Sequence, residues 1–219
     1  LHTTDGIYWT AELELKVPQE GMTINYSYQI EQNGIVIRKE WDSFSRSIFL
    51  SGSSRKIYRI NDCWKNIPEQ LYLYSSAFTE ALLAHPEKEN IPQRYKKGLI
   101  IKAYAPRINK DYCLAICGNQ KSLGHWDPEK AVLMSDTNFP EWQIELDASK
   151  LKYPLEYKFI LYNKQEKKAD CWEKNPNRYL ADPELKTNET LVIADRYVYF
   201  DIPAWKGAGI AIPVFSLKS

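Results

Sequence analysis

Apolar and polar side chains alternate with a period of two along several stretches of this chain. The pattern is clearest over residues 142–146 and 157–161, and it recurs over residues 9–15 and 192–200. Strands with one apolar and one polar face build antiparallel sandwiches or barrels. We therefore expect an all-β fold made of such strands. On this pattern Trp142 and Trp9 face a core.

Two other segments divide the chain. Residues 75–85 form the one good helix candidate, because a serine can cap its start and Pro86 ends it. Residues 85–98 carry two prolines and many charges, which is typical of a linker, and a new strand begins at Leu99.

Composition excludes several classes of protein. The 219 residues have 44% hydrophobic content, enough for a packed core, and a net charge of +1 from 29 basic and 28 acidic residues. This balance argues against a nucleic-acid partner. No apolar run reaches the roughly 20 residues that a membrane helix needs, so we expect no membrane partner either.

The four cysteines and three histidines form no metal-binding pattern. Cys113 and Cys117 lie four residues apart in a predicted strand, roughly 13 Å along it, which is too far for a disulfide. We expect free, buried thiols, a reducing compartment and hence a cytoplasmic location. We expect no cofactor and no metal.

The same order of motifs occurs twice. The clearer copy has Leu-Gly-His-Trp-Asp at 123–127, Leu-Glu-Tyr-Lys-Phe at 155–159 and Cys-Trp-Glu-Lys-Asn-Pro-Asn-Arg at 171–178. The fainter copy has Ile-Asn-Tyr-Ser-Tyr at 24–28 and Glu-Trp-Asp at 40–42. We call residues 1–84 the first copy and residues 99–203 the second copy, joined by the linker 85–98.

Counterparts of residues 99–130 are absent from the first copy. A sandwich without its opening strands exposes an apolar face and unpaired edges. We therefore expect the first copy to be partial, with its opening strands supplied by residues preceding Leu1 or by another chain.

This order of motifs resembles a starch-binding domain, carbohydrate-binding module family 20, most fully over residues 97–200. The resemblance implies two immunoglobulin-like antiparallel β-sandwich modules, the first lacking its N-terminal strands. It also implies a partner, an α-glucan polysaccharide such as starch or glycogen, or a malto-oligosaccharide.

The resemblance also implies a sugar site. It assigns Trp126, Lys158, Trp172, Glu173 and Asn177 to one site in the second copy, and Trp41 to the place of Trp172 in the first. On the residues alone, a loop Trp can equally cover the core, an exposed lysine can simply be solvated, and Asn177 can form a turn. The family often has a second site with tyrosines, which the stretches 109–111 and 136–138 lack. In the first copy, Ser27 stands where the lysine belongs.

The residues 205–219 contain Gly-Ala-Gly-Ile-Ala-Ile-Pro-Val-Phe-Ser-Leu. This run resembles the opening of a glycoside hydrolase family 77 catalytic barrel. It implies that residues 204–219 start a truncated catalytic domain and that the chain is the N-terminal, non-catalytic part of a 4-α-glucanotransferase. Two alternatives remain open: a non-enzymatic glycogen-targeting protein, and a protein-interaction sandwich in which Trp126 and Trp172 anchor a partner chain.

Overall fold

The computed structural model describes residues 1–40, 46–52, 56–64, 89–105, 108, 110–195, 198 and 200. Within this part of the chain the structure is all-β, and its helical segments are three short 3₁₀ turns. The predicted all-β class is confirmed. The strands are β1 (Met22–Tyr26), β2 (Gln29–Gln32), β3 (Ile35–Lys39), β4 (Arg46–Leu50), β5 (Ile57–Asn61), β6 (Lys97–Tyr104), β7 (Tyr112–Gly118), β8 (Val132–Leu133), β9 (Glu141–Asp147), β10 (Leu155–Asn163), β11 (Lys168–Trp172), β12 (Arg178–Leu180) and β13 (Glu189–Asp195), and the turns are η3 (Lys121–Trp126), η4 (Pro128–Lys130) and η5 (Ala148–Lys150).

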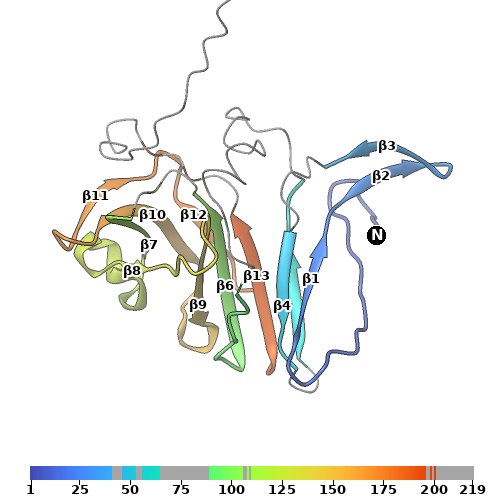
Figure 1. Cartoon of the computed structure of the whole chain (residues 1–219), viewed down its shortest axis with the longest axis horizontal. Coiled ribbons are helices and arrows are strands. Elements are labelled where there is room, and N and C mark those ends of the chain that lie inside the picture. Colours follow the sequence, from blue (N-terminus) through green and yellow to red (C-terminus); the bar gives the residue numbers. More distant parts are fainter. Residues whose placement is uncertain are drawn as a thin grey trace, which may run out of the picture.

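The second copy is a sandwich of two sheets (Figure 1). One sheet has the order β11-β10-β7-β8, with β12 also paired to β10, and the other has the order β5-β13-β6-β9. Their facing side chains form the main core. The predicted strands over 142–146 and 157–161 are confirmed as parts of β9 and β10, and Trp142 is 2% exposed, as its pattern predicts.

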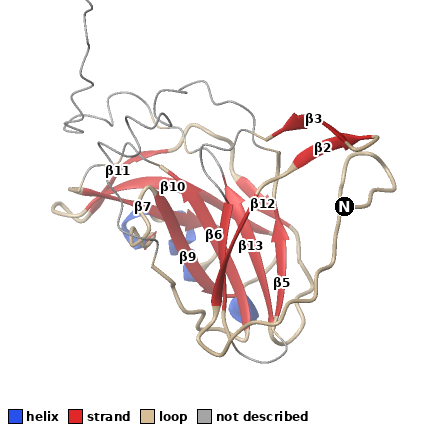
Figure 2. Cartoon of the chain, turned by 45° about the vertical axis from the view of Figure 1, so that its right-hand side comes forward, coloured by secondary structure: helices blue, strands red, loops and turns tan. Residues whose placement is uncertain are grey.

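Two strand pairs are parallel, which the sequence pattern did not predict. β13 runs parallel to β6 and also to β5, while the other pairs of the described sheets are antiparallel. Parallel neighbours need a long connection. Here the connection between β6 and β13 is the rest of the second copy. Because β5 belongs to the first copy, the two copies share one sheet, in which β9, β6, β13 and β5 lie side by side (Figure 2).

The first copy adds a third layer. Ile100 and Val192 point away from the main core and pack with Ile48 and Leu50 of β4, against which β1 also lies. The β1-β4 pair therefore covers the outer face of the β6-β13 sheet (Figure 1). The hairpin of β2 and β3 extends away from this contact.

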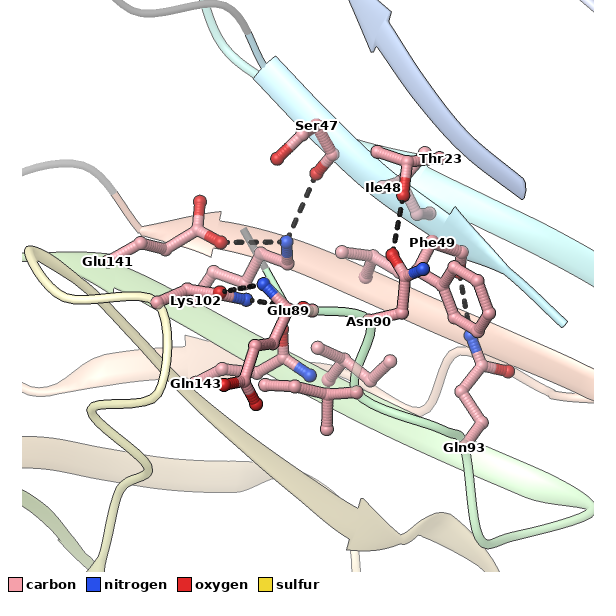
Figure 3. Close-up of a pocket in the computed structure, with 14 residues that line it drawn as sticks. Thr23, Ser47, Ile48, Phe49, Glu89, Asn90, Gln93, Lys102, Glu141 and Gln143 are labelled. Carbon is pink, nitrogen blue, oxygen red and sulfur yellow. Dashed lines mark hydrogen bonds and ion pairs between the residues drawn. The ribbon is translucent and has the colours of Figure 1, made fainter. Parts of the chain in front are cut away.

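Polar contacts fasten the two copies along this seam (Figure 3). The Lys102 Nζ atom donates to the Ser47 carbonyl oxygen at 3.1 Å and to the Glu141 carboxylate at 3.0 Å. The Thr23 hydroxyl donates to Asn90 Oδ1 at 2.7 Å. Residues 89–96, within the predicted linker, thus run along the seam in contact with both copies, and β6 begins at Lys97. The domain boundaries inferred from the sequence stay a prediction.

The first copy repeats the strand register of the second. Tyr26 pairs with Arg46 as Tyr157 pairs with Arg178. Gln29 pairs with Lys39 as Ile160 pairs with Trp172, and an irregularity follows one residue later in both hairpins. β1 and β2 together therefore correspond to β10, β3 to β11 and β4 to β12.

The prediction of a strand over residues 9–15 is wrong. These residues form no strand, and Trp9 is 58% exposed instead of lying in a core. Their counterpart β9 pairs with β6, and the described part of the first copy offers no equivalent of β6 to accept such hydrogen bonds. The predicted exposure of apolar side chains in this copy is confirmed at Ile7, Tyr8, Trp9, Leu13, Leu15, Ile30, Ile35, Val36 and Ile37.

Three other predictions concern segments that lie wholly or partly outside the described residues. The helix predicted over 75–85 and the segment 204–219 lie outside them. The run 192–200 is confirmed as a strand only up to Asp195. No helix of the described part is long and apolar enough to cross a membrane, and no cluster of metal-ligating side chains occurs in that part.

The cysteines carry no disulfide. Cys113 and Cys117 are buried, Cys171 is half-buried, and Cys63 is exposed, so burial was predicted correctly for part of the set. Burial raises the pKa of the Cys113 thiol to about 11 and also raises that of Cys117. Both thiols are therefore held in their protonated, unreactive form.

Trp142 and Trp9 offer a matched test of this fold. We expect Trp142→Ala to lower the free energy of unfolding by about 3–5 kcal/mol, because it opens a cavity in the main core and removes the hydrogen bond from the indole to the Ala105 carbonyl. We expect Trp9→Ala to change it by about 0.5 kcal/mol or less. Chemical denaturation of both variants measures this difference. Equal losses would contradict the assignment of Trp9 to the surface.

Candidate functional site

Trp126 and Trp172 come together beside the outer face of the β7-β10 sheet. Their ring centroids are 6.2 Å apart and the ring planes are inclined by 44°. Trp172 ends β11 and packs on the outer face of the β7-β10 sheet, against Ala115, Cys117 and Ile160. Both indoles are half-buried, so each ring keeps an exposed part. Sequence analysis predicted these two side chains for one site, and the fold places them in contact.

The loop that carries Trp126 explains the Leu-Gly-His-Trp motif. Leu123 is fully buried in the main core and anchors the loop. Gly124 has a φ of +77°, and a Cβ atom there would lie 2.7 Å from the Lys130 carbonyl oxygen. His125 and Trp126 also have positive φ, at +53° and +62°. A non-glycine residue in this region is strained, and such strain concentrates at functional sites.

Asp127 fixes the exit of the loop. Its carboxylate accepts a hydrogen bond from the Glu129 backbone N–H at 3.1 Å and caps η4, which Pro128 begins. The hydrogen bond from Lys130, together with that from the Glu129 N–H, lowers the pKa of Asp127. The Cys117 thiol donates to the Asp127 carbonyl oxygen at 3.5 Å, which ties the loop to β7.

Lys158 lies on the outer face of β10, opposite the buried Tyr157 and Phe159. Ile160 follows on the same face and pairs with Trp172, so Lys158 extends the surface on which Trp172 rests. Lys158 is half-buried and has no ion-pair partner among the described residues. Its ammonium group can therefore donate hydrogen bonds to a ligand beside the two rings.

Glu173 requires a correction. The sequence predicted its carboxylate on sugar hydroxyls, but its side chain is 0% exposed. The carboxylate accepts hydrogen bonds from the Phe159 backbone N–H at 2.8 Å, from Asn175 Nδ2 at 3.0 Å and from Arg178 Nη2 at 2.9 Å. With these internal donors it points away from a ligand. Arg178 is the charged partner of this carboxylate, whereas Lys174 next to it in the sequence is exposed.

The position of Glu173 follows from the edge of β10. β12 pairs with β10 as far as Tyr157, and β11 pairs with it from Ile160 onward. The edge between them, at Lys158 and Phe159, has no strand partner. Glu173 fills this gap, because its own N–H donates to the Phe159 carbonyl oxygen at 3.0 Å while its carboxylate accepts from the Phe159 N–H. Buried backbone groups need such partners.

Asn177 is exposed in the turn that precedes β12, where its side chain is accessible to a ligand. Sequence reasoning missed the hydrogen bond from Asn175 to Glu173 and the burial of the Glu173–Arg178 pair. All three residues lie inside the quoted Cys-Trp-Glu-Lys-Asn-Pro-Asn-Arg motif, and a buried acid followed by an arginine in one short loop is the signal that was available.

The first copy places Lys39, not Trp41, at the position of Trp172. Gln29 pairs with Lys39 as Ile160 pairs with Trp172, and Glu40 bonds to Tyr28 as Glu173 bonds to Phe159. The motif alignment was wrong by two residues, since it matched tryptophans where the buried glutamates correspond. Trp41 itself lies outside the described residues. Ser27 corresponds to Lys158, as the sequence predicted.

The two stretches that lack the second-site tyrosines, 109–111 and 136–138, make contacts within the chain. Asn138 Oδ1 accepts from the Glu89 backbone N–H at 2.8 Å, and its Nδ2 donates to the Glu89 carbonyl oxygen at 2.9 Å. Lys164 Nζ contacts the Asp136 carboxylate at 3.4 Å. Asn109 lies outside the described residues. The absence of a second sugar site therefore stays a prediction.

Comparison with known proteins identifies the second copy. The family model described as starch binding domain, of carbohydrate-binding module family 20, matches residues 101–192, which include both indoles and Lys158. This part of the chain is a starch-binding domain. The chain is also similar to 4-alpha-glucanotransferase DPE2 of Oryza sativa subsp. japonica, with 24% identity over 238 aligned residues. That match covers 100% of the chain, which spans 24% of the length of the relative.

Two solved structures are similar over part of the chain. A family 15 glucoamylase from Hypocrea jecorina has 22% identity and a TM-score of 0.39, and covers 47% of this chain and 17% of its own. The family 20 module of a maltotetraose-forming amylase from Pseudomonas saccharophila STB07 has 18% identity and a TM-score of 0.36, and covers 45% of this chain and 99% of its own.

Gly124 tests the geometry of the loop. We expect Gly124→Ala to lower the free energy of unfolding by about 1–3 kcal/mol, because it combines a strained φ with a clash against the Lys130 carbonyl. Gly34→Ala is the matched control, since Gly34 has the same φ of +77° but nothing within 4 Å of the added Cβ. Thermal melts compare the two. A control that costs as much as Gly124→Ala would show that strain alone, not the close approach, sets the penalty.

Proposed function

We propose that this chain binds α-1,4-glucans, such as starch, glycogen or malto-oligosaccharides, at the surface formed by Trp126 and Trp172. The observation that carries the proposal is the pair of indoles, 6.2 Å apart and inclined by 44°. The family match over residues 101–192 supports it, because the match encloses both rings.

The chemistry of a glucose ring fits this surface. A glucose ring has polar edges and an apolar C–H face, which stacks well on a large rigid aromatic side chain. Two inclined rings suit the curved path of an α-1,4-glucan better than a flat chain of cellulose. Lys158 on the outer face of β10 and the exposed Asn177 then supply hydrogen bonds to the hydroxyls.

We also propose that the chain is the N-terminal, non-catalytic part of a 4-α-glucanotransferase with a downstream catalytic domain. The similarity to the rice enzyme supports this, since it spans the whole chain and only a quarter of that enzyme. Glycosyl transfer would then use two carboxyl groups of the downstream domain, flanking the scissile bond about 5–5.5 Å apart. A binding unit would raise the local concentration of glucan near that domain. The free thiols favour a cytoplasmic location for it.

The indole pair gives the direct test of glucan binding. We expect Trp126→Ala and Trp172→Ala each to weaken the binding of β-cyclodextrin by about 1–3 kcal/mol, the loss expected when an aromatic anchor is truncated. Isothermal titration calorimetry measures the affinity, and thermal melts check that each variant is folded. Trp9→Ala is the control, because it removes an exposed indole outside this surface. Unchanged affinity in both site variants would reject the site and favour the alternative of a protein-interaction surface.

The first copy is expected to contribute little to this binding. Lys39 and Ser27 occupy the positions of Trp172 and Lys158, so the copy has neither the ring nor the cation there. We expect calorimetry of the whole chain to give one dominant site, which Trp172→Ala weakens and Trp41→Ala leaves intact. Binding that survives Trp172→Ala but is lost in Trp41→Ala would assign the site to the first copy.

A further inference from the structure

We propose that Glu173 and Arg178 form a buried ionic clasp that positions Trp172 and Lys158 for glucan binding. This inference rests on the proposed function. In this proposal, neither Glu173 nor Arg178 contacts the glucan. Both act through the backbone of the residues that do.

The clasp is a connected set of contacts. Arg178 approaches both oxygens of the Glu173 carboxylate, with Nε 3.2 Å from Oε1 and Nη2 2.9 Å from Oε2. Its guanidinium carbon lies 4.8 Å from the centroid of the Phe159 ring. The side chains are 18% and 0% exposed for Arg178 and Glu173. A two-point ion pair in this setting has a defined direction, unlike a single exposed one.

The clasp acts on the peptide bonds next to the two ligand-binding residues. The Phe159 N–H donates a hydrogen bond to the Glu173 carboxylate, and this N–H belongs to the peptide bond between Lys158 and Phe159. The Glu173 N–H donates to the Phe159 carbonyl oxygen, and this N–H belongs to the peptide bond between Trp172 and Glu173. The backbones of Lys158 and Trp172 are therefore held beside the gap between β11 and β12 along one edge of β10.

The first copy contains the same clasp without the ligand-binding residues. Glu40 exchanges the same two hydrogen bonds with Tyr28, at 3.0 and 3.2 Å. Arg46 binds the Glu40 carboxylate, and its guanidinium carbon lies 5.3 Å from the Tyr28 ring centroid. The residue before Glu40 is Lys39, where the second copy has Trp172. The chain thus contains a natural control, because the Glu173 clasp follows a tryptophan whereas the Glu40 clasp follows a lysine.

The first-copy clasp includes one more described carboxylate. Asp62 is a second carboxylate on Arg46, at 3.0 Å, and it also accepts hydrogen bonds from the hydroxyls of Tyr26 and Tyr28. Burial and the charge of Asp62 raise the pKa of Tyr28 to about 12. Arg46 therefore keeps Asp62 as an ion-pair partner when Glu40 is neutralised.

The experiment compares Glu173→Gln with Glu40→Gln in the whole chain. Glutamine keeps the shape of the side chain and removes the charge that orients the arginine. We expect both variants to melt at a lower temperature than the unmodified chain. Only Glu173→Gln should also weaken β-cyclodextrin binding, by roughly 2- to 30-fold, the range for residues that act on a ligand without touching it. Equal affinity for the unmodified chain and Glu173→Gln would overturn the proposal, and so would an equal loss in both variants.

A spectroscopic measurement keeps the test independent of glucan binding. Two indoles 6.2 Å apart couple in near-ultraviolet circular dichroism. We expect Glu173→Gln to reduce this coupled signal and Glu40→Gln to leave it unchanged. If the unmodified chain fails to bind β-cyclodextrin, the proposed function fails, and the dichroism alone decides whether the clasp positions Trp172. An unaltered signal in Glu173→Gln would overturn it.

Arg178→Lys serves as a second variant where Glu173→Gln does not fold. Lysine preserves the charge but offers a point contact in place of the planar fork. We expect Arg178→Lys to fold and to weaken binding less than Glu173→Gln does. Full affinity in Arg178→Lys, with full dichroism, would show that the two-point geometry has no positioning role.

Discussion

The site depends on how one buried glutamate completes the edge of β10. On one edge, the strand loses β12 after Tyr157 and gains β11 at Ile160, and the Phe159 N–H and carbonyl between them would be left without hydrogen bonds. An unpaired buried N–H costs about as much as a lost hydrogen bond, so the gap needs a partner. Glu173 supplies it with its backbone and its carboxylate, and Arg178 neutralises the charge. The loop from Glu173 to Arg178 is thereby fixed, and Trp172 is fixed with it.

Much of the fold was predictable from the sequence, because period-two patterns report directly on strands with one buried face. Trp142 is the clearest case, with its pattern in β9 and its side chain in the core. The same pattern failed at Trp9, because a strand also needs a neighbour, and residues 9–15 have none among the described residues. The parallel pairing of β13 with β5 and β6 depends on contacts between distant parts of the chain, which local patterns do not report.

The sequence likewise predicted some features of the site correctly and others wrongly. Motif order correctly predicted that Trp126 and Trp172 come together, although their part in binding, and that of Lys158, stays a prediction. It misplaced Glu173, because a motif gives the residue but not the direction of its side chain. It also misplaced Trp41, since matching the tryptophans concealed that Glu40 and Glu173 are the equivalent pair. The register of the hairpins, which only the structure provides, corrects both errors.

The central claim is that glucan binding uses Trp126 and Trp172 of the seven tryptophans. The most direct measurement is a two-dimensional NMR spectrum of the indole N–H groups during titration with β-cyclodextrin, with each signal assigned by substitution. The account predicts that the signals of Trp126 and Trp172 shift and saturate together, while those of Trp142 and Trp9 stay in place. Shifts confined to the other tryptophans, or no shift in any of them, would contradict it.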